Sequence, residues 1–182
     1  MKLNIKSFYL VLLVVLVSFS FKIEETFVAE NEINWMTWAA VQEAQKKEPK
    51  KVFVDVYTNW CGWCKRMDAT TFHNQKVVSY INKHYYSVKF DAEERKSIVF
   101  KDRKYHYVKT GKRGYNELAT FLLDGRMSFP TTVFLDENLA ILTTVGGFLE
   151  AKEIDPMISF FATDNHLKKK WSQYEQSYKS IL

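Results

Sequence analysis

The stretch TNWCGWCKRM, Thr58–Met67, contains both cysteines of the chain, and the nature of this pair decides how the rest of the sequence is interpreted. Cys61 and Cys64 are separated only by Gly62 and Trp63. Two cysteines are too few for a disulfide-built scaffold. The pair must therefore form one local bond, contribute to a metal site or carry out redox chemistry.

The segments on either side of the pair predict a strand followed by a helix. KVFVDVY, Lys51–Tyr57, is apolar and β-branched, which indicates a strand buried on both faces with Asp55 as its one acid. A C-x-x-C at such a junction places Cys61 at a helix N-terminus, where free N–H groups and the helix dipole favour a thiolate. Cys61 is thus the expected attacking thiolate, and Cys64, one turn further in, the thiol that resolves a mixed disulfide.

Metal binding and a purely structural bond are the alternatives to redox chemistry. Zinc or copper would need further ligands, but there is no second C-x-x-C. The four histidines are not spaced as metal ligands usually are; they are His73, His84, His106 and His166. Haem attachment needs a histidine after the second cysteine, and Lys65 occupies that position. A structural disulfide across so short a loop would stabilise little. Redox activity is favoured, and the other two possibilities stay open.

The first half of the chain predicts helices alternating with strands. A helix starts after the N-cap Thr37 and is stopped by Pro49. Helical periodicity runs from Cys64 to about residue 72 and continues after a second N-cap, Asn74. YSVKFDAEE predicts a strand that ends near Asp91, and residues 98–113 a β-hairpin with its turn in TGKRG.

The second half predicts one more helix, two strands and two C-terminal helices. In YNELATFLLDG we expect Leu118, Phe121 and Leu122 to face inward. TTVFLDENLAILTTVGG predicts two strands joined by a turn. Asp155 and Pro156 form an expected N-cap and first helical residue, and residues 164–182 a last helix. The order of elements predicts a small α/β domain whose mixed sheet is covered on both sides.

Three separated motifs resemble the thioredoxin-like family. They are WCGWC at Trp60–Cys64, Asp55 six residues before Cys61, and SFPTTVFLD, in which Pro130 opens a strand. Lys89, and the TVGGF stretch that begins at residue 144, fit the same pattern. The resemblance covers residues 33–163 and is closest to the exported thioredoxin-like domains of thiol:disulfide interchange proteins. It implies a thioredoxin-like fold with a central mixed sheet flanked by helices. The expected β-hairpin insertion at about 95–114 and the extra C-terminal helix at 164–182 depart from this family pattern.

The resemblance also implies roles for residues around the cysteine pair. A buried Asp55 would have a raised pKa and could accept the Cys64 proton. A cis peptide bond at Phe129–Pro130 would turn the Phe129 backbone toward an extended substrate. Trp60 and Trp63 would offer an apolar surface to a peptide-like partner.

The dipeptide between the cysteines departs from the best-known reductants of the family. Gly62 and Trp63 stand where those proteins have Gly-Pro. This dipeptide tunes the redox potential, so the direction of electron flow stays open.

The N-terminus predicts export. Lys2 and Lys6 precede an apolar run from Phe8 to Val17, too short for a membrane span and typical of a signal peptide. We expect a signal at residues 1–20, cleaved after Ser20, and a linker at 21–32. An uncleaved anchor formed by residues 8–21 is the alternative. The expected location is periplasmic or otherwise exported, and membrane-anchored if the signal stays attached.

The positive charge of the chain is local. The formal net charge is +5, and eight Lys/Arg against one acid give residues 95–113 a charge of +7. Aromatic residues interleave with these cations, as in nucleic-acid surfaces, but export argues against nucleic acid. A solvated hairpin and a docking surface for an acidic partner remain the two interpretations.

The sequence therefore predicts an exported thiol:disulfide oxidoreductase that exchanges with protein thiols and disulfides through Cys61 and Cys64. We expect no cofactor, because the dithiol itself carries two electrons, and a membrane or periplasmic redox partner to recycle it. A non-catalytic binding module for an exported client is the main alternative. A thiol peroxidase, in which peroxide would oxidise Cys61, is a weaker one.

Overall fold

The computed structural model describes residues 32–182. The predicted signal at 1–20 and all but the last residue of the predicted linker at 21–32 lie outside these described residues. Within residues 32–182, no helix combines the length and the apolar character needed to cross a membrane.

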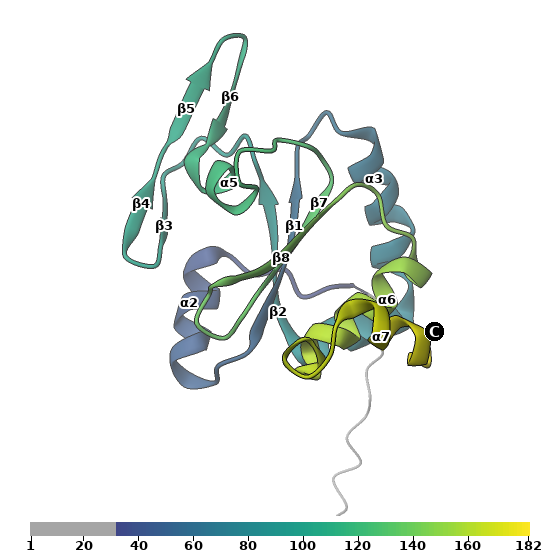
Figure 1. Ribbon diagram of the computed structural model, residues 1–182. Coiled ribbons are helices and arrows are strands. Elements are labelled where there is room, and N and C mark those ends of the chain that lie inside the picture. Colours follow the sequence, from purple (N-terminus) through teal and green to yellow (C-terminus); the bar gives the residue numbers. More distant parts are fainter. Residues whose placement is uncertain (1–31) are drawn as a thin grey trace, which may run out of the picture.

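A mixed four-stranded sheet forms the centre of the fold, in the order β2-β1-β7-β8 (Figure 1). Its strands are β1 (Lys51–Tyr57), β2 (Tyr85–Asp91), β7 (Thr131–Leu135) and β8 (Ile141–Gly146). β1 pairs in parallel with β2, and β7 runs antiparallel to both β1 and β8. The predicted mixed α/β sheet is confirmed.

Helices cover both faces of this sheet, because β1 is apolar on both. Val52, Val54 and Val56 belong to a core shared with α2 (Trp38–Lys47) and α5 (Glu117–Leu122). Phe53, on the opposite face, belongs to a second core. That core is shared with α3 (Gly62–Ala69), α4 (Gln75–His84) and α6 (Ala151–Ala162). Alternation along β1 therefore builds two cores from one strand.

Short polar side chains set the helix starts, as the sequence predicts. Thr37 Oγ1 accepts the Ala40 N–H at the start of α2, at 3.2 Å. Asn74 Oδ1 accepts the Val77 N–H at 3.2 Å and caps α4, after the 3₁₀ turn η1 (Thr71–His73). These bonds satisfy amide donors that the first helical turn leaves free.

The insertion contains two β-hairpins, whereas the sequence predicts one over residues 98–113. β3 (Ile98–Phe100) pairs with β4 (Arg103–Tyr105), and β5 (Tyr107–Thr110) pairs with β6 (Arg113–Asn116). The first turn lies at Lys101 and Asp102, which both adopt positive φ. Such turns usually use glycine or asparagine, so this one carried no recognisable signal. Figure 1 shows the hairpins extending from one side of the domain.

Helix α5 differs from the prediction at Phe121. Leu118 and Leu122 are buried as expected, but the Phe121 side chain is 46% exposed. Its ring lies 5.9 Å from that of Tyr105 on β4. Phe121 thus faces the first hairpin instead of the sheet.

The prediction that Asp155 and Pro156 open a helix is wrong. Helix α6 begins five residues earlier, at Ala151, and Pro156 lies inside it. The Glu150 N–H donates to the Glu153 carboxylate at 2.7 Å, which satisfies the helix start upstream of the proline.

The single helix predicted over residues 164–182 is also interrupted. Asp164 adopts a left-handed conformation (φ 55°) and precedes the 3₁₀ turn η2 (Asn165–Leu167). A short α7 (Trp171–Ser177) follows. Leu167 is 75% exposed and does not share the buried face of Tyr174.

The chain end is held to α6 by the buried Asp155. Its carboxylate accepts hydrogen bonds from the hydroxyls of Tyr178 and Ser180, each at 2.6 Å. An aromatic cluster of Phe160, Trp171 and Tyr174 adds packing between α6 and α7. Asp155 therefore anchors the C-terminus and has no part in starting a helix.

Replacing Tyr178 with phenylalanine should destabilise the protein by about 1–2 kcal/mol, because Asp155 Oδ1 loses the hydrogen bond that the Tyr178 hydroxyl donates. The free energy of unfolding in urea would measure this. Leu167→Ala, at an exposed position of the same tail, is the control and should stay within about 0.5 kcal/mol of wild type. An unchanged stability in Tyr178→Phe would show that Asp155 does not hold the tail.

Candidate functional site

The two cysteines form a disulfide at the junction between β1 and α3. Cys61 is the N-cap residue of α3, and its Cα lies 5.3 Å from that of Cys64. The Cys64 backbone N–H points at Cys61 Sγ, at 3.0 Å. When the bond is reduced, this donor and the helix dipole would stabilise a thiolate on Cys61.

Both cysteines are buried. Cys61 is 5% exposed and Cys64 2%, and both are flanked by the exposed side chains of Trp60 and Trp63. Gly62, the first residue of α3, has open space where a side chain would be. Both cysteines are therefore buried in a segment that carries two exposed indoles, and no side chain at Gly62 adds to their cover.

Asp55 lies on the face of β1 that α3 covers. It shares this face with Phe53, whose core includes Met67 of α3. The Asp55 side chain is buried, and its Oδ1 has no hydrogen-bond partner among the described residues. Thr132, opposite Asp55 on β7, also has an unpartnered hydroxyl. An unpaired carboxylate oxygen thus lies beneath the helix that carries the cysteines.

Burial raises the pKa of Asp55 to about 7, and the nearby Lys89 only partly opposes this rise. Desolvation disfavours the charged carboxylate. A carboxyl group with such a pKa can both take up and release a proton near neutral pH.

Lys89 connects Asp55 to helix α3. It is opposite Asp55 in the β1–β2 register, and its Nζ lies 3.8 Å from Asp55 Oδ2. The same ammonium is hydrogen-bonded to the Asp68 carboxylate on α3. The aromatic rings of Trp35 and Tyr57 flank it at 5.5 and 5.3 Å. Asp68 was missed in the sequence, although its position four residues after Cys64 places both on one helix face.

One aromatic wall beside Cys61 joins Trp60 to the segment before β7. The rings of Trp60 and Phe129 lie 6.0 Å apart, and the Phe129–Pro130 peptide bond is cis. The guanidinium of Arg113, from β6, lies 4.1 Å from the Trp60 ring centre. The Trp60 indole N–H donates to the Glu93 carboxylate at 3.1 Å. The contacts of Arg113 and Glu93 join segments remote in sequence, which no local pattern signals.

A second aromatic cluster forms around Trp63. Its ring centre is 5.5 Å from that of Phe148, which follows β8. The Arg66 guanidinium covers both rings, at 5.3 and 5.5 Å. The two exposed tryptophans of the WCGWC motif thus each carry an arginine over the ring.

No cluster of three or more His, Cys, Asp or Glu side chains suited to a metal ion occurs in the part of the chain that the structure describes. The arrangement that the geometry does assemble is a disulfide, a helix N-terminus and a buried acid. These are the parts needed for exchange between a dithiol and a disulfide.

A family model described as "Protein of unknown function, DUF255" (Thioredox_DsbH) matches residues 26–181. The chain belongs to this thioredoxin-like DsbH/DUF255 family. An uncharacterised protein of Archaeoglobus fulgidus is 30% identical over 108 residues, which are 58% of this chain and 76% of that protein.

Longer relatives share only this region. Uncharacterised protein B0495.5 of Caenorhabditis elegans is 26% identical over 153 residues, 83% of this chain but 19% of the relative. Rat spermatogenesis-associated protein 20 is 36% identical over 73 residues, 38% of this chain and 9% of the relative. This DsbH/DUF255 chain thus spans a small part of these longer relatives.

Solved structures confirm the thioredoxin-like fold. A thioredoxin of Thermus thermophilus superposes with a TM-score of 0.56 at 11% identity, covering 76% of this chain and 94% of that one. A DsbH oxidoreductase gives 0.52 at 18% identity, covering 75% and 88%. A thioredoxin-fold protein of Helicobacter pylori gives 0.54 at 15% identity, covering 69% and 76%. The predicted fold and family are therefore confirmed.

The Asp55→Asn variant should remove a pH dependence of stability. The pKa of Asp55 is about 7 in the folded protein, against 3.8 for the free side chain. The unfolded chain therefore ionises first, and the stability present below about pH 4 is lost as the pH rises toward 7. Asparagine does not ionise. Between about pH 4 and 7 the free energy of unfolding of the variant should therefore rise relative to that of wild type, by on the order of 1.4 kcal/mol per unit of difference between the folded and unfolded pKa values.

Urea unfolding of the oxidised proteins at pH 4, 6 and 8 measures this gain. Asp124→Asn, at an exposed aspartate, controls for the loss of one negative charge. A difference between Asp55→Asn and wild type that stays constant across the three pH values would contradict a raised pKa at Asp55.

Proposed function

We propose that this protein is an exported thiol:disulfide oxidoreductase that exchanges disulfides with protein substrates through Cys61 and Cys64. One observation carries the proposal: the Cys61–Cys64 disulfide caps the N-terminus of α3, where the Cys64 N–H meets Cys61 Sγ. A bond placed only for stability would close a loop too short to contribute much.

Exchange proceeds in two balanced steps. The Cys61 thiolate attacks one sulfur of the substrate disulfide, so that a mixed disulfide forms and one substrate thiolate leaves. Cys64 then attacks Cys61 Sγ, which re-forms the Cys61–Cys64 bond and releases the second substrate thiolate. The substrate gains two electrons and the protein loses two; the reverse sequence oxidises a substrate dithiol.

Asp55 is the proposed proton acceptor for Cys64. The Cys64 thiol must lose its proton before it attacks, and it lies in a buried environment that disfavours thiolate. The unpartnered Oδ1 of Asp55, on the sheet face beneath α3, is available for this proton. Lys89 and Asp68 position Asp55 against the helix.

The exposed aromatics support a peptide-like substrate. Trp60 and Trp63 are exposed, and Phe129, which precedes the buried Pro130, packs against Trp60. We propose that these four residues form the surface that contacts the substrate chain on either side of its cysteine. Exposed tryptophans are costly in water unless a partner covers them.

Export and recycling are also proposals, supported by the N-terminal sequence pattern at residues 1–20. Persistent disulfides belong to oxidising compartments such as the periplasm. There, a membrane-bound or periplasmic redox partner would restore the state of the pair after each turnover.

Separate serine substitutions test the roles of the cysteines. With a pre-oxidised peptide disulfide as substrate, Cys61→Ser should react no faster than the uncatalysed background, because the attacking thiolate is lost. Cys64→Ser should instead accumulate a mixed disulfide on Cys61, because the resolving thiol is lost. Quenched-flow sampling with alkylation and mass spectrometry distinguishes the two species.

A double cysteine variant tests the alternative of a binding module. If the double variant Cys61→Ser/Cys64→Ser retained the protein's biological function, the cysteines would be incidental and the proposal overturned. A separate measurement, the reduction potential of the Cys61–Cys64 pair, indicates the direction of electron flow. A value of about −270 mV indicates a reductant, and one of about −120 mV an oxidant.

A further inference from the structure

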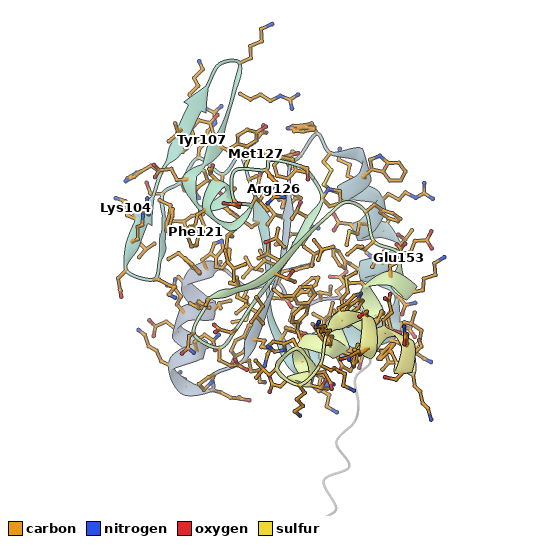
Figure 2. The ribbon with its side chains drawn as sticks, viewed as in Figure 1. Lys104, Tyr107, Phe121, Arg126, Met127 and Glu153 are labelled. Carbon is orange, nitrogen blue, oxygen red and sulfur yellow. A yellow bond between two sulfur atoms is a disulfide. The ribbon has the colours of Figure 1, made fainter. Side chains whose placement is uncertain are left out.

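The two hairpins carry a concentrated positive charge that other side chains do not neutralise. The eight Lys/Arg of residues 95–113 are all exposed. Among residues 32–182, none of them lies within ion-pairing distance of an acid, although ion pairs occur elsewhere on the surface. Figure 2 shows Lys104, one of the eight, pointing away from the outer side of β4.

The second hairpin brings this charge to the candidate active site. Arg113 lies over the Trp60 ring, and the rings of Tyr115 and Phe129 are 6.0 Å apart. Val108 is opposite Tyr115 in the β5–β6 register, so Arg113, Tyr115 and Val108 share one face of the hairpin. This face runs continuously outward from the aromatic wall beside Cys61.

The face ends in an apolar hollow between the hairpins and α5. The hollow has a volume of about 450 Å³, with Val108, Tyr115 and Phe121 in its lining and Arg103 and Glu117 also bordering it. Val108 and Phe121 are each nearly half exposed. We call the surface from Trp60 through Arg113 and Tyr115 to this hollow the hairpin track.

The acids next to the hairpin track are already engaged. Glu93 accepts the Trp60 indole N–H, Glu94 the Lys96 backbone N–H, and Glu117 the His106 backbone N–H. They anchor the base of the hairpins instead of pairing with the exposed cations. These acids keep their negative charge, but residues 93–117 hold eight Lys/Arg against four acids, so the net field of the segment still favours an anionic occupant.

We propose that the hairpin track binds an acidic segment of the substrate protein next to its reactive cysteine, with one apolar side chain of that segment in the hollow. The inference rests on the proposed function, since it places the segment beside Cys61. Carboxylates along the segment would pair with the exposed cations, which raises the rate of encounter more than the final affinity.

Protein fits the hairpin track better than nucleic acid does. Binding of single strands relies on open aromatic faces for base stacking. Here Tyr105 is buried under Arg103, Tyr107 lies beneath Arg95, and Tyr115 packs against Phe129. The open apolar surface is the hollow, which suits an aliphatic side chain.

Single-turnover exchange with matched peptides tests this inference. Reduced protein is mixed with oxidised disulfide peptides whose flanking segment is acidic, neutral or basic, each made with leucines or with serines. The acidic leucine peptide should react roughly tenfold faster than the neutral one, and this ratio should fall toward one in 0.5 M NaCl. The acidic serine peptide should react more slowly than its leucine counterpart.

Charge-reversal variants locate the effect. Arg103→Glu/Lys112→Glu should abolish or invert the ratio of acidic to neutral rates. Lys168→Glu/Lys179→Glu makes the same change in net charge near η2 and α7, remote from the hairpins in Figure 1, and should keep the wild-type ratio. If the hairpin variant does not fold, the salt dependence of the wild-type rates still tests the inference.

Three results would overturn the inference in different ways. Equal rates for all peptides would contradict binding of an acidic segment to the hairpin track, and the proposed function would still stand. If no peptide reacted, the proposed function would be contradicted, and the inference that rests on it would fail as well. Tighter binding of a single-stranded oligonucleotide than of a thiol-free acidic peptide, measured by fluorescence anisotropy, would assign the surface to nucleic acid.

Discussion

The burial of β1 on both faces is the constraint on which the rest of the structure depends. A strand that is apolar on both sides must be covered by helices from both sides and paired on both edges. The sheet and its two cores satisfy these requirements. Because burial sets the position of β1, it also sets the position of the turn that follows, and Cys61 lies at the start of α3. The position of the cysteine pair is thus a consequence of how one strand is buried.

The same burial creates the one polar feature that the core tolerates poorly. Asp55 interrupts the apolar face of β1, and its free energy of ionisation is raised by the loss of water. Lys89 supplies an opposite charge but divides it between Asp55 and Asp68. Replacing the acid with an apolar residue would be expected to stabilise such a site. Its presence beneath a cysteine-bearing helix is not accounted for by stability and supports the proton transfer that we propose.

In the function that we propose, the insertion adds selectivity to a site whose fold is shared with other thioredoxin-like proteins. Arg113 and Tyr115 extend the wall that Trp60 and Phe129 begin, so the surface beside the cysteine pair is built partly from the hairpins. Thiol exchange needs only the sulfurs and a proton acceptor. The choice of protein substrate must then come from contacts around them, and a charged, partly apolar hairpin face can supply these contacts without altering the redox centre.

The sequence by itself determined the elements whose signals are local. The bounds of β1, the caps at Thr37 and Asn74 and the placement of Cys61 at a helix start all follow from short-range patterns and match the structure. Helix α6 was predicted wrongly, because an aspartate before a proline imitates a helix start and Asp155 bonds to Tyr178 and Ser180 instead. The C-terminal helix was predicted as continuous, whereas Asp164 adopts a left-handed conformation and a 3₁₀ turn follows it. Only the tertiary structure decided that Lys89 would also bond to Asp68, and which partners Trp60 and Phe121 would have. Their contacts join segments far apart in the chain, and such contacts depend on how whole elements pack, which no local pattern of residues encodes.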